Sequence, residues 1–203
     1  MLLNKDDLII PEHAIGIVIF AHGSGSGSDS PRNQYVAKIL QQASIGTFLF
    51  DLLTEEEDAN YENRFNIPLL TERLISATQW VQQQKIAKDL PLSYFGASTG
   101  AASALFAAAQ LGKTIHCVVS RGGRPDLAMD ALQKVVSPTL LIVGGNDDVV
   151  IELNQKAYAQ LQVEKELKII PGATHLFEEP GTLEQVAIVA KQWFMKYLGA
   201  ITS

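Results

Sequence analysis

Short apolar segments alternate along this chain with longer segments of helical pattern, and this alternation restricts the possible folds more than any other feature. The strand candidates are rich in β-branched and aromatic residues and are bounded by turn residues. They are Ile15–Ala21, Thr47–Leu52, Leu92–Ala97, Ile115–Ser120, Thr139–Val143 and Leu167–Ile170. Because these segments are apolar throughout rather than alternating, we expect both of their faces to be buried.

Helices are predicted between these strands and after the last of them. Their expected positions are about Arg32–Ala43, Pro68–Lys88, Thr99–Leu111, Asp126–Lys134, Ile151–Gln160 and Thr182–Leu198. Strand–helix repetition predicts an α/β fold, with a mostly parallel central sheet and helices on both faces. At 203 residues, we expect one domain over 1–203.

Composition and charge exclude several classes of protein. The chain is 47% hydrophobic and 19% charged, which is enough apolar material for a globular core. Its net charge of -6 argues against nucleic acid or an anionic membrane as a partner. No apolar run approaches the ~18 residues of a membrane span, and the start "MLLNKDDLII" carries acidic residues where a secretory signal is apolar. We therefore expect a cytoplasmic protein; the sequence gives no oligomeric state.

Cysteine and histidine usage predicts neither a disulfide framework nor a metal site. Cys117 is the single cysteine, and no Cys/His cluster has zinc spacing. Because Cys117 lies inside an apolar run, we expect a buried structural thiol. No metal and no organic cofactor is predicted.

The stretch "FAHGSGSGSDSPRN" has the composition of a linker but follows a strand directly. Too little chain precedes it to fold alone, so we interpret it as a strand-to-helix loop. A dinucleotide fingerprint fails here, because its third glycine would fall on Ser28 or Ser30. The string "AAAQLGKT" fails as a phosphate loop, because Ala107 replaces the first glycine and the segment runs from helix into strand.

The stretch "YFGASTGAASALF" contains a G-x-S-x-G pattern from Gly96 to Gly100, centred on Ser98. An apolar strand ends at the first glycine and an Ala-rich helix begins just after Ser98. A nucleophile elbow has this context, since its sharp turn needs small neighbours. The alternative is an ordinary helix-capping serine.

A serine nucleophile needs a base, and the base needs an orienting carboxylate. Of the four histidines, His175 in "IIPGATHLF" follows the last strand on a loop at the carboxyl edge of the sheet. The carboxylate is expected after the preceding strand, in "LLIVGGNDDVV", where we select Asp147; Asp148 is interpreted as a solvated neighbour or a helix cap. Ser98, Asp147 and His175 follow the chain order of the α/β-hydrolase triad.

With these motifs, the chain resembles the α/β-hydrolase superfamily, and within it the small, lidless members of the dienelactone hydrolase family. The resemblance runs from "VIFAHGSGSG" through "FGASTGA" and "GGNDDVV" to "PGATHLFEEPG". It implies a minimal hydrolase fold without a cap domain. Dienelactone hydrolases proper use a cysteine nucleophile, so Ser98 favours a more general ester or acyl substrate.

The resemblance also implies a role for the Gly/Ser loop. In this superfamily the loop supplies one backbone N–H of the oxyanion hole, and the residue after the nucleophile, here Thr99, supplies the other. We assign the first donor to Ser24, with Gly25 as the alternative. His22 is expected to fix the loop by hydrogen bonding rather than to act in catalysis.

The predicted function is hydrolysis of a small ester or related acyl substrate through an acyl-enzyme. Thioester hydrolysis or acyl transfer by the same triad, and ligand binding without turnover, remain alternatives. In "SRGGRPDLA", Arg121 and Arg124 are candidates for binding a substrate carboxylate. The connection that carries them is short, which predicts an open site. Glu55–Asp58 is interpreted as a solvated acidic loop.

Overall fold

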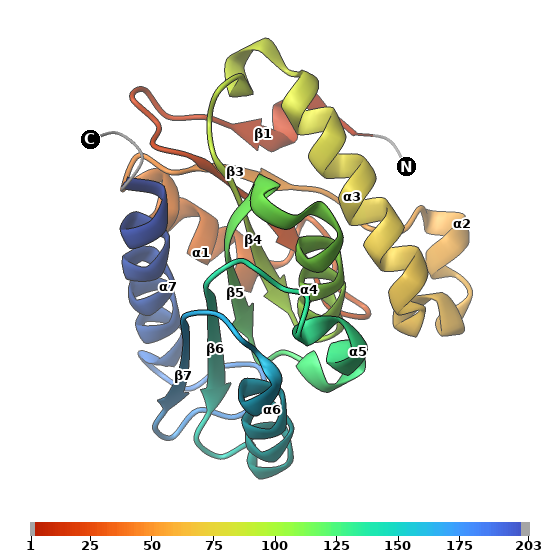
Figure 1. The fold of residues 1–203 in the computed structure, drawn as a ribbon, viewed down its shortest axis with the longest axis vertical. Coiled ribbons are helices and arrows are strands. Elements are labelled where there is room, and N and C mark those ends of the chain that lie inside the picture. The colour runs from red at the N-terminus through yellow and green to blue at the C-terminus, as the bar shows by residue number, and fades with distance from the viewer. Residues whose placement is uncertain (1–2, 200–203) are drawn as a thin grey trace.

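A computed structural model describes residues 3–199, which form a central seven-stranded sheet covered by helices on both faces (Figure 1). The strand order is β1-β3-β2-β4-β5-β6-β7; β1 pairs antiparallel with β3, and every other neighbouring pair is parallel. The strands are β1 (Leu8–Ile9), β2 (Ile17–Ala21), β3 (Gly46–Leu49), β4 (Leu92–Ala97), β5 (Ile115–Arg121), β6 (Thr139–Gly144) and β7 (Lys165–Ile170). The α/β fold class expected from the sequence is confirmed.

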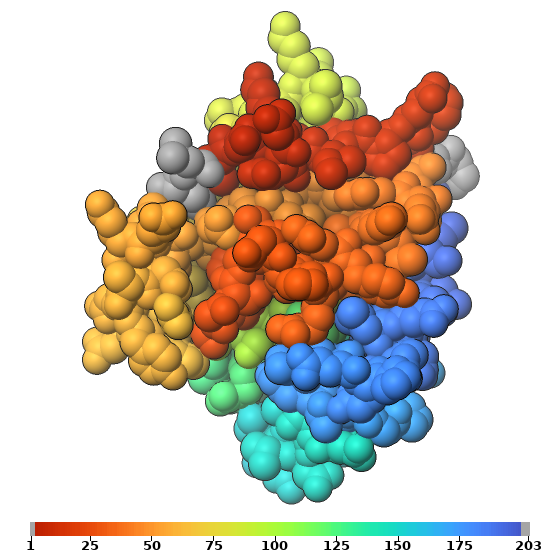
Figure 2. Space-filling view, turned by 180° about the vertical axis from the view of Figure 1, so that it is seen from behind, coloured from red at the N-terminus to blue at the C-terminus, as the bar shows by residue number. Residues whose placement is uncertain are grey.

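The helices divide between the two faces of the sheet. They are α1 (Pro31–Gln41), α2 (Glu55–Asp58), α3 (Ile67–Gln83), α4 (Thr99–Leu111), α5 (Met129–Leu132), α6 (Asp148–Gln160) and α7 (Thr182–Gly199). Helices α1 and α7 pack together against one apolar cluster, and Figure 2 shows the two segments side by side. Helices α3 and α4 pack together on the opposite face.

Central strands are buried as their composition predicts. Every residue of β2, β4 and β6 is buried, since helices cover both of their faces. Cys117 is confirmed as a buried thiol; its sulfur lies 3.3 Å from Ser93 Oγ, and burial raises the pKa of this thiol to about 12. Such a thiol is not a nucleophile at neutral pH.

The edges of the sheet differ from the sequence prediction. The two-residue strand β1 was not expected, and it is too short to show a hydrophobic period. At the other edge, β7 begins at Lys165 rather than Leu167, pairs only with β6, and alternates between exposed and partly buried residues up to the buried Ile170. Strand β3 ends at Leu49 rather than Leu52, and the buried side chains of Phe50 and Leu52 belong to a loop.

Two connections also differ from expectation. The predicted helix Asp126–Lys134 is a 3₁₀ turn, η5 (Pro125–Ala128), followed by the single helical turn of α5. The predicted acidic loop forms α2, which is closed by a capping box between Thr54 and Glu57, whose carboxylate also pairs with Arg73.

Among residues 3–199, none of the helices combines the length and the hydropathy needed to cross a bilayer. Within the same stretch, no three His, Cys, Asp or Glu side chains are grouped as a metal ion would require.

Candidate active site

The turn between β4 and α4 holds Ser98 in a conformation that few residues adopt. Its φ of 51° and ψ of -122° are strained for a residue with a Cβ atom. A Cβ added at Gly100 would lie 2.1 Å from the Ala21 carbonyl oxygen, so only glycine lets the first turn of α4 approach β2 this closely. The result is a half-buried serine at the N-terminus of a helix, whose dipole favours negative charge there.

His175 and Asp147 come together from two loops at the carboxyl edge. The Nδ1 atom of His175 lies 2.7 Å from Oδ2 of Asp147. The imidazole is 39% exposed and the carboxylate 16% exposed, so the pair is partly desolvated and still accessible. Because an ionised carboxylate only accepts hydrogen bonds, this contact keeps a proton on Nδ1 and leaves Nε2 as the basic nitrogen.

The end of β5 links this pair to Ser98. The Ser98 N–H donates to the carbonyl of Arg121 at 3.3 Å. A Cβ added at the next residue, Gly122, would lie 3.1 Å from the His175 carbonyl and 3.7 Å from its Cε1. Ser98 and His175 therefore lie beside two consecutive residues, Arg121 at the end of β5 and Gly122 just after it. The Ser98 side chain makes no capping hydrogen bond to α4.

The Gly/Ser loop after β2 lies directly against the nucleophile turn. A Cβ added at Gly23 would lie 2.9 Å from Cβ and 3.7 Å from Oγ of Ser98. Ser24 and Gly25 line a small pit together with Thr99, the first residue of α4. The backbone N–H of Thr99 is one of those a helix leaves without an internal partner. The expected pair of oxyanion donors thus comes from two loops that meet beside Ser98.

His22 is buried and hydrogen-bonded through both ring nitrogens. Its Nε2 accepts the Leu52 N–H at 2.9 Å, so Nδ1 carries the proton and donates to the Gly23 carbonyl at 3.0 Å. Burial lowers the pKa of His22, and the ring stays neutral. The ring therefore ties the Gly/Ser loop to the chain that follows β3.

The two arginines predicted to bind substrate already have internal partners. Arg124 forms two hydrogen bonds with the carboxylate of Asp126, at 2.9 and 2.8 Å. Arg121 is only 6% exposed; it donates to Asn33 Oδ1 at 3.2 Å and lies over the Phe177 ring. Burial, and then the charge of Arg32, lower the pKa of Arg121 to about 10. Substrate binding by these two residues stays a prediction without a structural contact to support it.

Arg64 is a residue at the site that sequence reasoning missed. Its NH1 atom would lie 3.6 Å from a Cβ added at Gly25, and its NH2 atom pairs with Asp58 at 2.7 Å. Arg64 and Asp58 line a polar cleft of about 800 Å³ that begins at the Gly/Ser loop; Asp29 and Asp51 also line it. The segment of α2 is therefore a wall of this cleft. The T-x-x-E capping pattern at Thr54 was the sequence signal for it.

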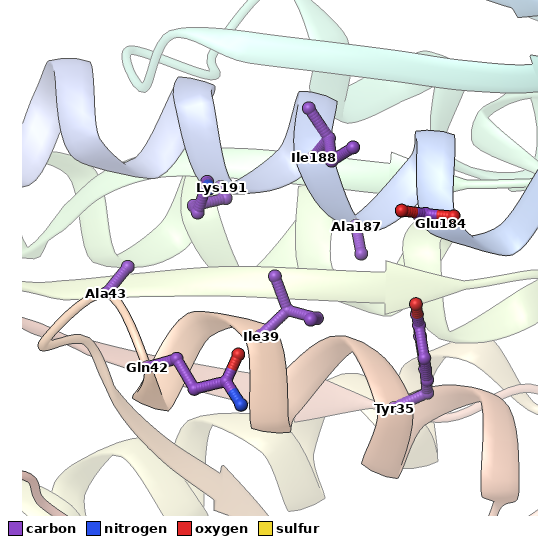
Figure 3. A pocket seen from close by; sticks show the side chains of 8 residues that line it. All are labelled: Tyr35, Ile39, Gln42, Ala43, Glu184, Ala187, Ile188 and Lys191. Carbon is purple, nitrogen blue, oxygen red and sulfur yellow. The ribbon is translucent and has the colours of Figure 1, made fainter.

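Another hollow, of about 170 Å³, lies between α1 and α7 (Figure 3). Figure 3 shows Tyr35, Ile39 and Gln42 from α1 and its end facing Glu184, Ile188 and Lys191 from α7. None of the candidate catalytic side chains lines it. This hollow is therefore separate from the candidate active site.

Residues 14–190 match the family model described as an alpha/beta hydrolase domain. The chain belongs to this alpha/beta hydrolase family, as its fold and its elbow indicate.

Two solved structures are similar to this chain. A crystal structure of dienelactone hydrolase from Anabaena variabilis is 56% identical, covers 94% of this chain and 90% of that chain, and superposes with a TM-score of 0.91. Est1E from Butyrivibrio proteoclasticus, at 16% identity with 95% and 93% coverage and a TM-score of 0.82, shares the fold. The resemblance expected from the sequence is confirmed, and the chain is similar to hydrolases.

Mycobacterium tuberculosis strains CDC 1551 and H37Rv each have a relative that is 58% identical over 191 residues and carries the name "Putative phosphoribosyl transferase". The match covers 94% of this chain and 43% of each relative. The chain thus spans less than half the length of these curated relatives.

Proposed function

We propose that this protein is a serine hydrolase that cleaves a small ester or related acyl substrate through an acyl-enzyme. Ser98 is the nucleophile, His175 the general base and Asp147 the group that orients the base. The observation that carries this proposal is the strained elbow at Ser98, with φ at 51°, beside a histidine bound to a carboxylate at 2.7 Å. An ordinary capping serine needs neither the strain nor the pair.

In the proposed mechanism Ser98 Oγ attacks the acyl carbonyl carbon while His175 Nε2 removes the hydroxyl proton. The carbonyl π electrons move to oxygen, where the N–H groups of Thr99 and Ser24 stabilise the oxyanion. Gly25 is the alternative to Ser24. Each such donor contributes roughly 3 kcal/mol to transition-state stabilisation. Collapse expels the alcohol, which takes the proton from His175, and water then hydrolyses the acyl-enzyme by the same steps.

Asp147 holds the imidazole in the tautomer with its proton on Nδ1 and stabilises the imidazolium that forms. The Gly/Ser loop can act only if its backbone stays against Ser98. His22 supports that position by bridging Gly23 and Leu52. The close approach at Gly23 explains why this loop lacks side chains at its point of contact.

The first test is labelling with a serine-reactive fluorophosphonate followed by mass mapping. We expect the label on Ser98 in the wild-type protein and no label in Ser98→Ala or His175→Ala. Ser44→Gly is the matched control, because Ser44 lies between α1 and β3 at the opposite edge of the sheet and its φ of 56° suits glycine; this variant should label normally. A folded wild-type protein that takes no label would contradict the proposal and favour ligand binding without turnover.

Thioester hydrolysis and acyl transfer use the same proposed triad, so product analysis must separate them from ester hydrolysis. Acyl-thioesters and added alcohol acceptors are the discriminating substrates. The name of the mycobacterial relatives refers to proteins more than twice as long as the matched segment. The elbow and the His–Asp pair support acyl hydrolysis, and no feature of this site favours phosphoribosyl transfer.

A further inference from the structure

Arg121 is a buried cation that pairs with no carboxylate among residues 3–199. The residue lies at the carboxyl end of β5 and is 6% exposed. Its Nη2 donates to Oδ1 of Asn33, a neutral amide, at 3.2 Å, and its Nε has no hydrogen-bond partner in the described chain. Because removing a charge from water is costly unless the charge is paired, this position favours a bound anion.

A second arginine, Arg32, lies close to Arg121. Burial first, and then the charge of Arg32, lower the pKa of Arg121 to about 10. Arg32 is the second residue of α1, and its Nε is also buried without a hydrogen-bond partner in the part of the chain described. Two neighbouring guanidinium groups repel each other, whereas an anion between them is attracted by both.

The two guanidinium groups lie between the same two segments of the chain. Arg32 Nη1 lies 3.3 Å from Oε1 of Glu178. The Arg121 guanidinium carbon lies 5.9 Å from the ring centroid of Phe177, the residue before Glu178. Arg121 also contacts Asn33, the residue after Arg32. Both cations are therefore placed between the first turn of α1 and the segment just after the proposed base.

The first turn of α1 contributes to an environment that favours negative charge. Ser30 caps this helix of 11 residues, and its Oγ accepts the Asn33 N–H at 3.5 Å. Pro31 has no N–H, so the Arg32 N–H is the remaining backbone donor without an intrahelical partner. The helix dipole adds partial positive charge at the same end. Backbone and side chains therefore act in the same direction here.

An anion can enter this region at Arg32. The Arg32 side chain is 29% exposed, and that of its partner Glu178 is 65% exposed. An ion pair this exposed contributes little to stability and exchanges readily with solvent. Glu178 can therefore move aside, which opens Arg32 to a ligand from solvent and leaves Arg121 behind it as the buried partner.

We propose that Arg32 and Arg121 form a binding site for a small oxyanion group, a carboxylate or a phosphate, at the first turn of α1. Guanidinium groups bind both kinds of group through paired N–H donors. The site adjoins the proposed active site, because the Arg121 carbonyl accepts the Ser98 N–H and a Cβ added at Gly122 would lie 3.7 Å from Cε1 of His175. Anion binding needs no ester turnover, so this inference goes beyond the proposed function and is tested apart from it.

The test follows the arginine Nε–H resonances of isotope-labelled protein by NMR during titration with inorganic phosphate or with acetate, at constant ionic strength. We expect the Arg32 and Arg121 resonances to shift and to saturate with at least one of these ions. Saturation with phosphate alone would assign the site to a phosphate group, and saturation with acetate alone to a carboxylate. Absence of a saturable shift with both ions in the folded wild-type protein would overturn the inference.

Three charge variants on or near α1 separate a built site from general attraction. Arg32→Gln should weaken the ion affinity about tenfold or more, as expected for the loss of a hydrogen bond to a charged group. Glu178→Gln removes a competing carboxylate and should strengthen it severalfold. Lys38→Gln is the matched control, because it removes the same charge from an exposed position of the same helix. It should leave the affinity unchanged; equal weakening in Arg32→Gln and Lys38→Gln would contradict the site.

Two variants test the buried cation itself, with the Arg32 resonance as the readout. Arg121→Met should abolish saturable ion binding. Arg121→Lys keeps the charge but not the planar fork of donors, and should bind the ion about tenfold more weakly. The lysine variant keeps the question open to test if the methionine variant does not fold. Wild-type affinity in a folded Arg121 variant would contradict the assignment.

Discussion

Two loops at the carboxyl edge each present a histidine, and the environments of the two rings suit them to different tasks. His22 is 8% exposed and both of its ring nitrogens are hydrogen-bonded to backbone. His175 is 39% exposed at its side chain, and one nitrogen contacts a carboxylate while Nε2 makes no hydrogen bond among residues 3–199. A base needs an unoccupied nitrogen, so only the second loop can supply one.

The carboxylates near the two histidine rings also differ in how they interact with them. Asp147 contacts His175 directly at 2.7 Å. Asp51 acts on His22 only through its charge, and its Oδ1 accepts the Ser28 N–H at 2.6 Å. One carboxylate is thus positioned to stabilise an imidazolium, and the other holds the shape of the Gly/Ser loop.

The largest expected effect comes from exchanging each histidine for glutamine. His175→Gln removes the proposed base and should lower kcat for a short ester by about 10⁴-fold or more, with little change in stability. His22→Gln keeps a donor and an acceptor in the loop and should lower kcat by less than about tenfold. Steady-state kinetics with 4-nitrophenyl acetate measures both; equal losses in the two variants would break the distinction between the loops.

A smaller effect is expected from the matched pair Asp147→Asn and Asp51→Asn. Asp147→Asn lets the amide hold the wrong His175 tautomer and should lower kcat about 10³- to 10⁴-fold with KM nearly unchanged. Asp51→Asn keeps an oxygen for Ser28 and should change kcat by severalfold at most. If Asp51→Asn proves as damaging as Asp147→Asn, the assignment of the orienting carboxylate is contradicted.

The smallest expected effect is on stability at low pH. Burial lowers the pKa of His22 below its ordinary value of 6.5. At a pH between the two pKa values, His22 is therefore protonated in the unfolded chain and neutral in the folded chain. The free energy of unfolding should therefore fall as pH falls below about 6.5. It should be insensitive to this group above that value, where both states are neutral.

Urea unfolding of the wild type and of His22→Gln at pH 7.5 and 5.5 measures the contribution of this one group. The variant should lose less stability between the two pH values than the wild type does. Its stability at pH 7.5 should be about 1 kcal/mol lower, because the glutamine oxygen accepts the buried Leu52 N–H in poorer geometry than Nε2 of the ring does. An identical loss of stability on acidification in both proteins would show that the pKa of His22 is not lowered in the folded state.

Most of the fold could be predicted from the sequence, because strands buried on both faces must be apolar and the helices between them must be longer. β4 and α4 have the predicted bounds, Leu92–Ala97 and Thr99–Leu111. The failures lie at the sheet edges and in single-turn helices. There, β1 and α5 are too short for a hydrophobic period to show.

The sequence by itself determined the order of the strands and helices and the position of the elbow. It also placed Ser98, Asp147 and His175 on three strand ends, since carboxyl ends of parallel strands share one edge. Only the tertiary structure decided which charged groups reach that edge. Arg121 is buried against Asn33, while Arg64, from a segment without strand or helix periodicity, lies at the Gly/Ser loop. The reason is physical: the partner of a charged side chain depends on the packing of segments far apart in the chain, which local pattern does not encode.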